Sequence, residues 1–384
     1  MAAVIDHVLA YPGMAAKLNE VSKLTKRNNP VGTNILLGDL AKGHTTVAGT
    51  TIFDCLADKI DCYDTTVKVS PILKEQFTKY SQLLQTYVAP PLFSSACAAD
   101  KCCIWDWIQK DLVADFLDPT DQTCTALARA AIRLGFHDAG PWKQGNKFGG
   151  ADGSIILNPE EMTRAENNGL QSIVAYTKKT MSKYPTAGVA DLVQFMAKIA
   201  TVTCPLGVRM RTFIGRPDST LANPEGLMPD IHQDTQSLVD MFNAKTIGPD
   251  GLVALIGAHT TAVQQFAIPN NPGSLDPTPG VWDVTFYNHT VDLSTFHIGN
   301  RRFPSDFLLS VSPLTNGSWN SFMDSHLGRN TWDNSFARAY LRLSLLGVQS
   351  INGLTDCTKV IPTQIMNFKG SVGHNNDVGP QPDD

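Results

Sequence analysis

The chain has 384 residues, a formal net charge of −5 and 17% charged residues, compared with about 25% in an average soluble domain. It has no basic block and no apolar run of about 18 residues, so neither a nucleic-acid partner nor a membrane-spanning helix is expected. The length is sufficient for one large core or for two domains.

Residues 1–90 are expected to form an N-terminal extension of unknown role. Helical patterns at 14–26 and 70–87 flank a Gly- and Thr-rich segment, and no catalytic motif is present. Cys55 and Cys62 are close enough in sequence to close a small local loop. Prolines and small residues between 90 and 99 indicate a linker, so a second domain is predicted over residues 91–384.

From Cys102 onward the chain is predicted to be mostly helical, because sustained alternation of apolar and polar residues is absent. Loops rich in Gly, Pro and Asn are expected at 140–153, 215–229 and 269–280, and the polar tail at 370–384 is expected to be loosely ordered. Long loops of this kind inside a compact domain are usually functional. The expected helices are 104–116, 123–134, 169–182, 189–201, 235–243 and 249–261.

The eight cysteines favour an oxidising compartment. They are even in number, are scattered along the chain, and form neither a CxxC pair nor a zinc-ligand spacing. Disulfide bonds are therefore expected, with a set of buried free thiols as the alternative. The sequons at Asn288 and Asn316 agree with secretion, although such triplets are common by chance. The first ten residues do not resemble a signal peptide, so we expect a mature secreted protein whose signal has been removed or replaced.

The segment ALARAAIRLGFHDAG, residues 126–140, carries the first candidate site. Apolar residues at helical spacing predict a helix over its first part. If this helix continues, Arg133 and His137 project from one face, because they are four residues apart. Asp138 would then point toward the Gly-rich loop that follows. The pattern indicates a reactive pocket beside a metal-binding loop; the alternative is a helix end with a surface arginine and a capping histidine.

A second candidate site begins with an apolar helix that ends at His259. Gly257 and Ala258 are small, so a flat group could approach this helix closely. The later segment DPTPGVWD, residues 276–283, has alternating oxygen ligands like those of a calcium loop, and Thr260 could supply another. The loop after the first histidine has the same character. The alternative is a histidine satisfied within the core and two solvated turns.

Four motifs in order, RLGFHD, GGADGS, VALIGAHT and DPTPGVWD, closely resemble those of the fungal class II haem peroxidases of the plant-peroxidase superfamily. The resemblance extends from Cys97 to Pro362. It implies a mostly α, disulfide-bonded haem-peroxidase fold, in which two helical halves sandwich one haem b and two calcium ions are bound.

This resemblance implies a role for the second histidine. His259 matches the proximal ligand that binds the haem iron through Nε2. Asp306 matches the aspartate that accepts a hydrogen bond from Nδ1 of that histidine, which makes the imidazole a stronger ligand. Without the resemblance, Asp306 would be an ordinary helix N-cap.

The residues around the first histidine match the distal side of the family's site. His137 matches the base that moves a proton between the two oxygens of hydrogen peroxide, and only its neutral form can accept that proton. Arg133 would stabilise the charge that develops as the O–O bond breaks, and Phe136 would pack over the haem. Asn167 matches the asparagine that hydrogen-bonds His137, and Glu161 the carboxylate that holds this asparagine.

The resemblance also implies metal ligands and disulfide pairs. The distal calcium would be bound by Asp138, Gly150, Asp152 and Ser154, and the proximal calcium by Thr260, Asp276, Thr278, Val281 and Asp283, with carbonyl oxygens from Gly150 and Val281. The implied pairs are Cys97–Cys103, Cys102–Cys357 and Cys124–Cys204, which leaves Cys55–Cys62 in the extension.

The chain departs from two specialised groups of the family. Manganese-oxidising relatives carry acidic residues at the positions held here by Ala126, Ala130 and Gln265. Relatives that oxidise bulky, high-potential aromatic compounds have a surface tryptophan at the position of Ala254. Neither kind of donor site is therefore expected in this chain.

The resemblance thus implies a secreted, monomeric haem peroxidase that reduces hydrogen peroxide to water and oxidises small phenolic or similar aromatic donors in one-electron steps. The loop 215–230 would border the haem edge, with His232 nearby. One alternative is a lignin-type or manganese-type enzyme with a relocated donor site, for example at Trp319 or Trp332, although these are more simply core residues. Another is a non-catalytic structural protein that binds haem and calcium.

Overall fold

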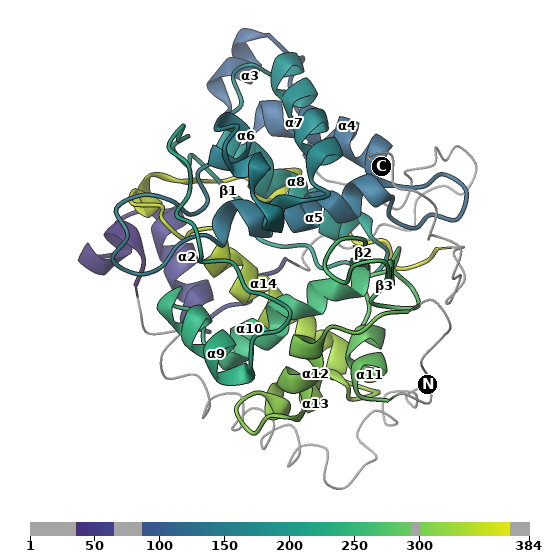
Figure 1. Cartoon of the computed structure of the whole chain (residues 1–384). Coiled ribbons are helices and arrows are strands. Elements are labelled where there is room, and N and C mark those ends of the chain that lie inside the picture. Colours follow the sequence, from purple (N-terminus) through teal and green to yellow (C-terminus); the bar gives the residue numbers. More distant parts are fainter. Residues whose placement is uncertain (1–35, 65–86, 293–299, 369–384) are drawn as a thin grey trace, which may run out of the picture.

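A computed structural model describes residues 36–64, 87–292 and 300–368 (Figure 1). The helix expected at 14–26, all but the last residue of the one expected at 70–87, and the polar tail at 370–384 lie outside these residues. Within them the chain is mostly helical, as predicted.

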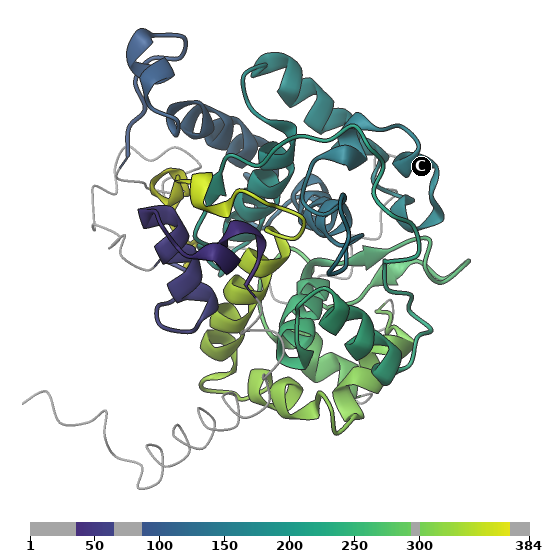
Figure 2. The ribbon, with the colours of Figure 1, turned by 90° about the vertical axis from the view of Figure 1, so that its left-hand side faces the viewer.

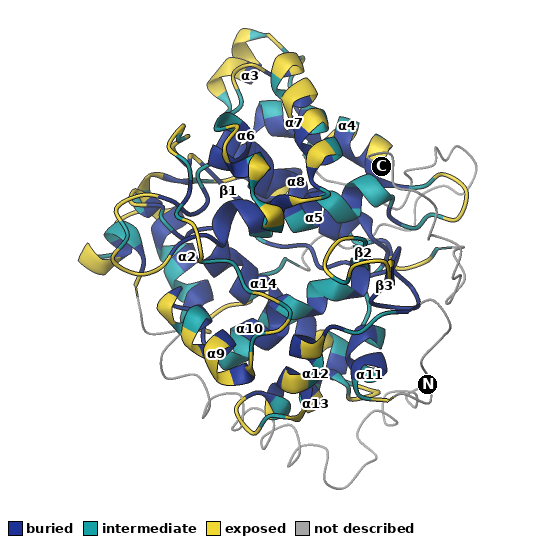
Figure 3. Ribbon diagram, viewed as in Figure 1, coloured by how far each residue is buried: buried dark blue, intermediate teal, exposed yellow. Residues whose placement is uncertain are grey.

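One half of the molecule is built around a helix that has no exposed face. The helix α8 (Val189–Thr203) is buried at all of its residues, and α4 (Cys103–Phe116), α5 (Ala126–Ala139) and α7 (Gln171–Lys183) pack against it (Figure 3). A Cβ atom at Gly135 would lie 2.6 Å from the Cβ of Ala197, so glycine is what lets α5 approach α8 so closely.

The other half contains the remaining long helices. They are α9 (Thr235–Ala244), α10 (Pro249–Ile256), α11 (Thr285–Val291), α12 (Pro304–Val311), α13 (Asn316–Phe322) and α14 (Gly328–Leu343). The helix α10 packs against α14, and α9 packs against both α10 and α12 (Figure 1). The helices after residue 261 were not predicted.

Two helix ends differ from the expected ones, and both carry candidate site residues. The helix expected to end near residue 134 continues as α5 to Ala139, because its last turn is buried. The helix expected over 249–261 ends at Ile256 and continues as the 3-10 helix η4 (Gly257–Thr261). His137 therefore lies on an α-helix, whereas His259 lies on a tighter turn.

Extended structure is limited to two short antiparallel pairs in the described residues. The strand β1 (Phe213–Ile214) pairs with β4 (Thr355–Asp356), and β2 (Val263–Gln264) pairs with β3 (Gly273–Ser274). Of the second pair, β3 lies within the loop expected at 269–280, and β2 precedes that loop. In Figure 1 this pair is found at the right of the molecule, near α5.

The described part of the N-terminal region, residues 36–64, packs against the C-terminal part of the chain. Its helix α2 (Val47–Leu56) contacts α14 and the 3-10 helix η6 (Ile351–Gly353), and Ile52 and Leu56 belong to the same hydrophobic core as α8 (Figure 2). Asp64 accepts a hydrogen bond of 2.6 Å from Arg209. Residues 36–64 therefore contribute to the main core.

The expected linker between residues 90 and 99 contains a helix instead. Residues Ser95–Ala99 form α3, because the Ser94 hydroxyl caps it by accepting a hydrogen bond of 3.1 Å from the Cys97 amide. A disulfide then joins Cys97 to Cys103 at the start of α4.

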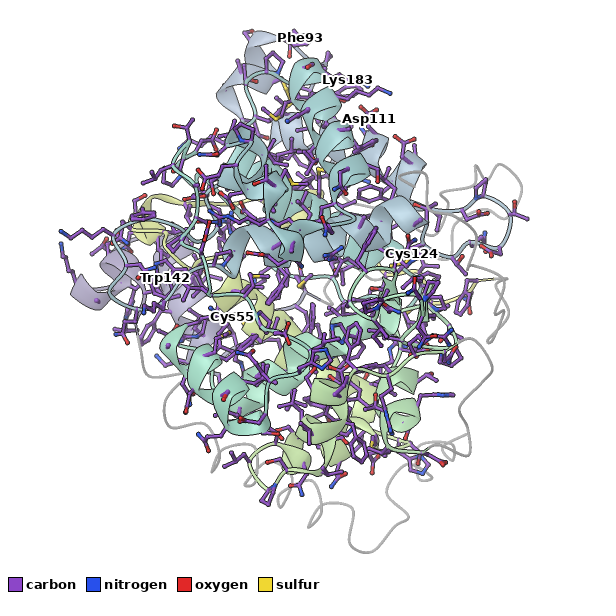
Figure 4. All side chains as sticks on the ribbon, viewed as in Figure 1. Cys55, Phe93, Asp111, Cys124, Trp142 and Lys183 are labelled. Carbon is purple, nitrogen blue, oxygen red and sulfur yellow. A yellow bond between two sulfur atoms is a disulfide. The ribbon has the colours of Figure 1, made fainter. Side chains whose placement is uncertain are left out.

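All four expected disulfides are present, and the described residues contain no free cysteine. They are Cys55–Cys62, Cys97–Cys103, Cys102–Cys357 and Cys124–Cys204 (Figure 4, where Cys55 and Cys124 are labelled). Among the helices in the described part of the chain, none combines the length and the apolar character needed to cross a membrane.

Replacing both Cys102 and Cys357 with alanine is expected to lower the free energy of unfolding by about 2–5 kcal/mol. This disulfide spans 255 residues, and cross-links across long loops restrict the unfolded chain most. The matched control is the pair of alanine substitutions at Cys97 and Cys103, which spans 6 residues and should cost less. Urea unfolding followed by circular dichroism measures both; equal losses would contradict the loop-length argument.

Candidate active site

A cavity of about 770 Å³ lies between the two helical halves. Its walls include Arg133 and His137 from α5 on one side and His259 from η4 on the other. This volume is in the range of about 300–1,000 Å³ that is usual for cofactor and ligand sites. The two histidines that were singled out in separate motifs therefore share one cavity.

His137 is buried and is held from both sides. Its Nδ1 lies 2.8 Å from the side-chain oxygen of Asn167, which can only accept, so Nδ1 carries the proton. Its Nε2 is then an acceptor and receives a hydrogen bond of 3.2 Å from Nε of Arg133. Burial, together with the positive charge of Arg133, lowers the pKa of His137 to about 3, so the imidazole is neutral at ordinary pH.

Two main-chain carbonyls fix the guanidinium of Arg133. Its Nη1 donates to the carbonyl of Asn168 at 2.8 Å, and its Nη2 donates to the carbonyl of Glu166 at 2.9 Å. Burial lowers the pKa of Arg133 to about 10, so the group keeps its positive charge at neutral pH. A fixed cation thus lies beside the neutral His137.

The expected role of the Glu161 carboxylate is wrong in one respect. Asn167 Nδ2 donates to the main-chain carbonyl of Glu161 at 2.7 Å, whereas the carboxylate of Glu161 accepts from the main-chain amide of Asn223 at 2.9 Å. The reason is that Glu161 lies in the 3-10 turn η2 (Glu161–Thr163), immediately before the turn that ends at Asn167, so its carbonyl is the nearer acceptor. Glu161 holds Asn167, but through its backbone.

On the opposite wall His259 is oriented by a buried carboxylate. Nδ1 of His259 lies 3.0 Å from Oδ2 of Asp306, which is fully buried in the first turn of α12. Phe286 and Phe303 contact the imidazole edge to face, with ring centroids 5.6 and 5.5 Å away. The His259 side chain keeps 31% of its surface exposed, and Nε2 is the ring nitrogen that remains for a ligand.

The remaining expected aromatic residue also lines the cavity. Phe136 lies edge to face with His137, with ring centroids 5.9 Å apart, and stacks over Phe242 at 6.4 Å. The expectation that small residues at 257 and 258 would admit a flat cofactor is wrong for Gly257. The space beside Gly257 is taken by the side chains of Tyr287 and Trp332. Ala258 does line the cavity.

Four side chains expected to bind the proximal calcium meet beside His259. Thr260 donates to Asp276 at 3.1 Å, and Thr278 donates to Asp276 at 2.7 Å and to Asp283 at 3.0 Å. Burial, and for Asp276 also the charge of Asp283, raises the pKa of both carboxyl groups above the usual range. Val281 is buried at the turn that links them, where its amide bonds the carbonyl of Thr278.

The expected distal calcium residues are gathered next to His137. Asp138 is fully buried; burial and the charges of Asp152 and Glu161 raise its pKa well above the usual range. The Ser154 hydroxyl is buried and interacts with the carboxylates of Asp152 and Glu161. Gly150 adopts φ +102° and its carbonyl accepts from the Asp152 amide at 2.8 Å.

Both clusters fit a hard cation. Each cluster combines two aspartates, one buried and one partly buried, with hydroxyl and carbonyl oxygens. Such a mixed oxygen set is typical of calcium. Two neighbouring carboxylates with little access to water repel each other, and a cation between them would offset that cost.

Several residues that hold the site were not predicted. Gln194 donates to Asp138 at 3.2 Å, and Asn223 donates to the carbonyl of Asp138 at 2.8 Å and accepts from the amide of Gly150 at 3.0 Å. Lys245 is buried and donates to the carbonyl of Leu227, which borders the cavity-lining segment that includes Met228. Nothing in the local sequence marks these residues, because their partners are distant along the chain.

The positions that carry acidic residues or a surface tryptophan in specialised relatives carry neither here. Ala126, Ala130 and Gln265 all line the cavity, and they bring no carboxylate to it. Ala254 is fully buried, and its carbonyl accepts a hydrogen bond of 2.9 Å from Trp332. Trp319 and Trp332 are both fully buried, which makes them core residues.

Comparison with known proteins agrees with this geometry. The family described as peroxidase matches residues 108–325. The chain belongs to the peroxidase family. This peroxidase is 30% identical over 317 residues to ligninase H2 of Phanerodontia chrysosporium, a match that covers 77% of the chain and 83% of the relative.

Two further relatives are also described as peroxidases. A peroxidase of Arthromyces ramosus is 30% identical over 297 residues, covering 71% of this chain and 79% of its own. The versatile peroxidase VPS1 of Pleurotus eryngii is 29% identical over 287 residues, covering 69% and 76%. The chain is therefore an oxidoreductase that acts on hydrogen peroxide, with the mostly helical fold of the fungal class II peroxidases.

Proposed function

We propose that this protein is a secreted haem peroxidase that reduces hydrogen peroxide to water and oxidises small phenolic or similar aromatic donors one electron at a time. The observation that carries the proposal is the pair of histidines on opposite walls of one cavity, each oriented by a different partner. Asn167 accepts from Nδ1 of His137 and so leaves Nε2 able to accept a proton, whereas Asp306 makes His259 a strong ligand.

In this proposal His259 binds the iron of haem b through Nε2, and Asp306 accepts the hydrogen bond from Nδ1. When bound, the haem would supply a redox-active iron centre that can give two electrons to hydrogen peroxide and regain them, one at a time, from the donors. The fit rests on the cavity between the two histidines and on the ring nitrogen of His259 that remains for a ligand. Phe136 packs against the cofactor from the distal wall.

His137 and Arg133 carry out the proton and charge steps. Nε2 of His137 accepts a proton from one oxygen of hydrogen peroxide and returns it to the other, so that water leaves. The guanidinium of Arg133, fixed by two carbonyls, stabilises the negative charge that develops as the O–O bond breaks. Asn167 and the carbonyl of Glu161 keep His137 in the tautomer that this step needs.

Two calcium ions complete the proposed site. Asp138, Gly150, Asp152 and Ser154 would bind the distal ion; Thr260, Asp276, Thr278, Val281 and Asp283 would bind the proximal ion. Asp138 follows His137 directly and Thr260 follows His259 directly, so each ion would hold one end of a histidine-bearing helix.

Four disulfides support secretion, because such bonds persist in oxidising compartments. The first sequon has Asn288 within α11, and the hydroxyl of its third residue, Thr290, is buried. Asn316, at the start of α13, is therefore the better site for a glycan. We propose that the secreted protein is a monomer.

The test is stopped-flow absorbance of the haem- and calcium-loaded protein mixed with one equivalent of hydrogen peroxide. We expect the Soret band to decrease and then to recover on addition of phenol, but not on addition of Mn²⁺ alone. No spectral change would support a non-catalytic haem protein, and equally fast recovery with Mn²⁺ would support a manganese-type enzyme. A His259→Ala variant, which lacks the proposed iron ligand, is expected to bind haem weakly.

A further inference from the structure

A methionine lines the cavity on the side of the helix α5. Met228, in the segment between β1 and α9, is partly exposed, and among the methionines of the described residues it alone belongs to the cavity lining. Oxidation of a thioether to a sulfoxide is a common oxidative modification of proteins. The described residues hold no free cysteine, so Met228 supplies the sulfur atom that lies within reach of peroxide in this cavity.

The sulfur of Met228 lies against the end of α5. A Cβ atom built at Gly140, the residue that follows this helix, would lie 2.9 Å from Sδ and 3.6 Å from Cε of Met228. The same point lies 2.9 Å from the carbonyl oxygen of Phe136, the residue before His137. Because Gly140 has no side chain, the sulfur rests directly on the helix turn that carries His137.

A buried lysine fixes the loop that carries Met228. Lys245, at the end of α9, has no exposed surface, and its Nζ donates to the carbonyls of Leu227 at 2.6 Å and Trp142 at 3.2 Å (Trp142 is labelled in Figure 4). Burial, together with the charge of Lys143, lowers the pKa of Lys245 to about 8, so the amine is mainly charged at neutral pH. Hydrogen bonds from a charged donor are among the strongest. The backbone next to Met228 is therefore held in place beside α5.

The phenolic side chain in the cavity lining is better protected from oxidation. Tyr340 is 2% exposed, and its hydroxyl donates to the side-chain oxygen of Gln194 at 3.1 Å. Burial raises the pKa of Tyr340 above its usual range, so the hydroxyl does not readily release the proton that is lost when a phenol is oxidised. The thioether of Met228 has no proton to lose.

Oxygen transfer to Met228 balances with hydrogen peroxide as the only reagent. The sulfur gives an electron pair to one peroxide oxygen, the O–O bond breaks as the S–O bond forms, and the other oxygen leaves with both protons as water. The sulfur is oxidised by two electrons, and the peroxide is reduced by two. His137 moves the proton and Arg133 stabilises the developing charge, as in the proposed reaction with a donor.

We propose that Met228 is a site of self-oxidation, at which the sulfur takes up an oxygen atom from peroxide in the absence of a donor, and that the sulfoxide slows further reaction with peroxide. The added oxygen turns an apolar side chain into a polar one. The sulfur already fills the space beside Gly140, so the loop or the end of α5 must shift to admit this oxygen. This inference rests on the proposed function, because it requires the peroxide reaction to take place in this cavity.

The test is peptide mass spectrometry of the haem- and calcium-loaded protein after a short exposure to a small excess of hydrogen peroxide without a donor. The measured quantity is the fraction of each methionine that carries one extra oxygen atom. Met366 is the internal control, because it is 52% exposed and does not line the cavity. Peroxide that acts from solution would oxidise Met366 first. We expect Met228 to be oxidised about 10-fold more than Met366, because its sulfur and the reacting groups share one cavity.

Two changes should protect Met228 and leave Met366 unaffected. His137→Ala slows the peroxide reaction, so oxidation of Met228 after the same exposure should fall by at least about 10-fold. An added phenol supplies electrons in place of the sulfur and should have the same effect. Equal oxidation of the two methionines in the parent, or oxidation of Met228 that is unchanged in His137→Ala, would overturn the proposed site.

Met228→Leu tests the effect of the sulfoxide, because leucine keeps the apolar volume but cannot take up oxygen. The rate of the Soret change is measured before and after exposure to peroxide, and each protein is compared with its own untreated sample. The parent and Met366→Leu should lose the same part of this rate, and Met228→Leu should lose less. Equal losses in all three would overturn the inhibitory effect. A parent without any Soret change would refute the proposed function, whereas a normal Soret change with unmodified Met228 would refute the self-oxidation alone.

Discussion

Replacing His137 with alanine is expected to slow the reaction of the haem-loaded protein with hydrogen peroxide by about 10²- to 10⁴-fold. The variant loses the imidazole that Arg133 and Asn167 hold in position, and with it the Nε2 atom that accepts the peroxide proton. The proton must then leave through water. Arg133 remains, and its charge should preserve part of the activity. Stopped-flow absorbance at the Soret band measures the rate constant.

His326→Ala is the matched control, because His326 is exposed and is not among the residues that line the cavity. Its rate constant should equal that of the parent. If His137→Ala also reacted at the parent rate, His137 would not be the base, and the proton route of the proposed function would be wrong.

The pH dependence of the same reaction tests the state of His137. Burial and the charge of Arg133 lower the pKa of this imidazole to about 3, compared with 6.5 for a free histidine. The base is therefore neutral at pH values above this pKa, and the rate should fall only as the pH approaches it. Asn167→Asp puts a carboxylate against Nδ1, which favours the charged form, and should move the fall to higher pH. A fall centred near the pKa of a free histidine in the parent would contradict the assigned environment.

Removal of calcium at neutral pH is expected to lower the free energy of unfolding by about 3–4 kcal/mol, for calcium supplied at roughly 100 to 1,000 times its dissociation constant. The physical reason is the neighbouring carboxyl groups of Asp276, which is buried, and Asp283, which is partly buried; loss of hydration raises the pKa of both. A carboxyl group with a raised pKa in the folded state destabilises the fold when it ionises. The calcium-free protein does not lose this free energy of unfolding at a pH below the usual carboxyl range, where both groups are protonated. The loss grows as the pH rises through and above that range.

The effect of a chelator should therefore be large at neutral pH and small in acid. Urea unfolding with calcium or with EGTA, at both pH values, measures it. Asp276→Asn should remove much of the calcium dependence, whereas Asp240→Asn, at an exposed position on α9, should preserve it. A chelator effect that is independent of pH, or that survives in Asp276→Asn, would contradict the proximal site.

The local parts of the site could be predicted from the sequence, because they depend on spacing within one element. Arg133 and His137 share a helix face, and Thr260, Asp276, Thr278 and Asp283 lie within a short stretch of chain, so helical periodicity and calcium-loop spacing marked them as candidates. The resemblance to a family then decided against a capping histidine and solvated turns. Short spacing was enough to suggest Cys55–Cys62, but the other three disulfide pairs could be predicted only through the resemblance to a family, since eight cysteines allow many pairings.

The rest depends on contacts that no local pattern encodes. The choice between the carbonyl and the carboxylate of Glu161 follows from the tight turns at 161–167, and the sequence does not specify their path. The closeness of Gly257 to Trp332 follows from the packing of α14 on α10, two elements that are distant in sequence. The helices α11 and α13 have 7 residues each, too short for a clear period.

The contact between residues 36–64 and the C-terminal part of the chain has a consequence for biosynthesis. The ribosome delivers the N-terminal part first, at about 5–20 residues per second, so α2 and Cys102 must wait for η6 and Cys357 before they can dock. During that interval Cys97 can react with either of two adjacent thiols, at Cys102 or Cys103, and only the bond to Cys103 is native. A bond between Cys97 and Cys102 would have to be exchanged before the native pairs could form, so we expect a disulfide isomerase to raise the yield of folded protein.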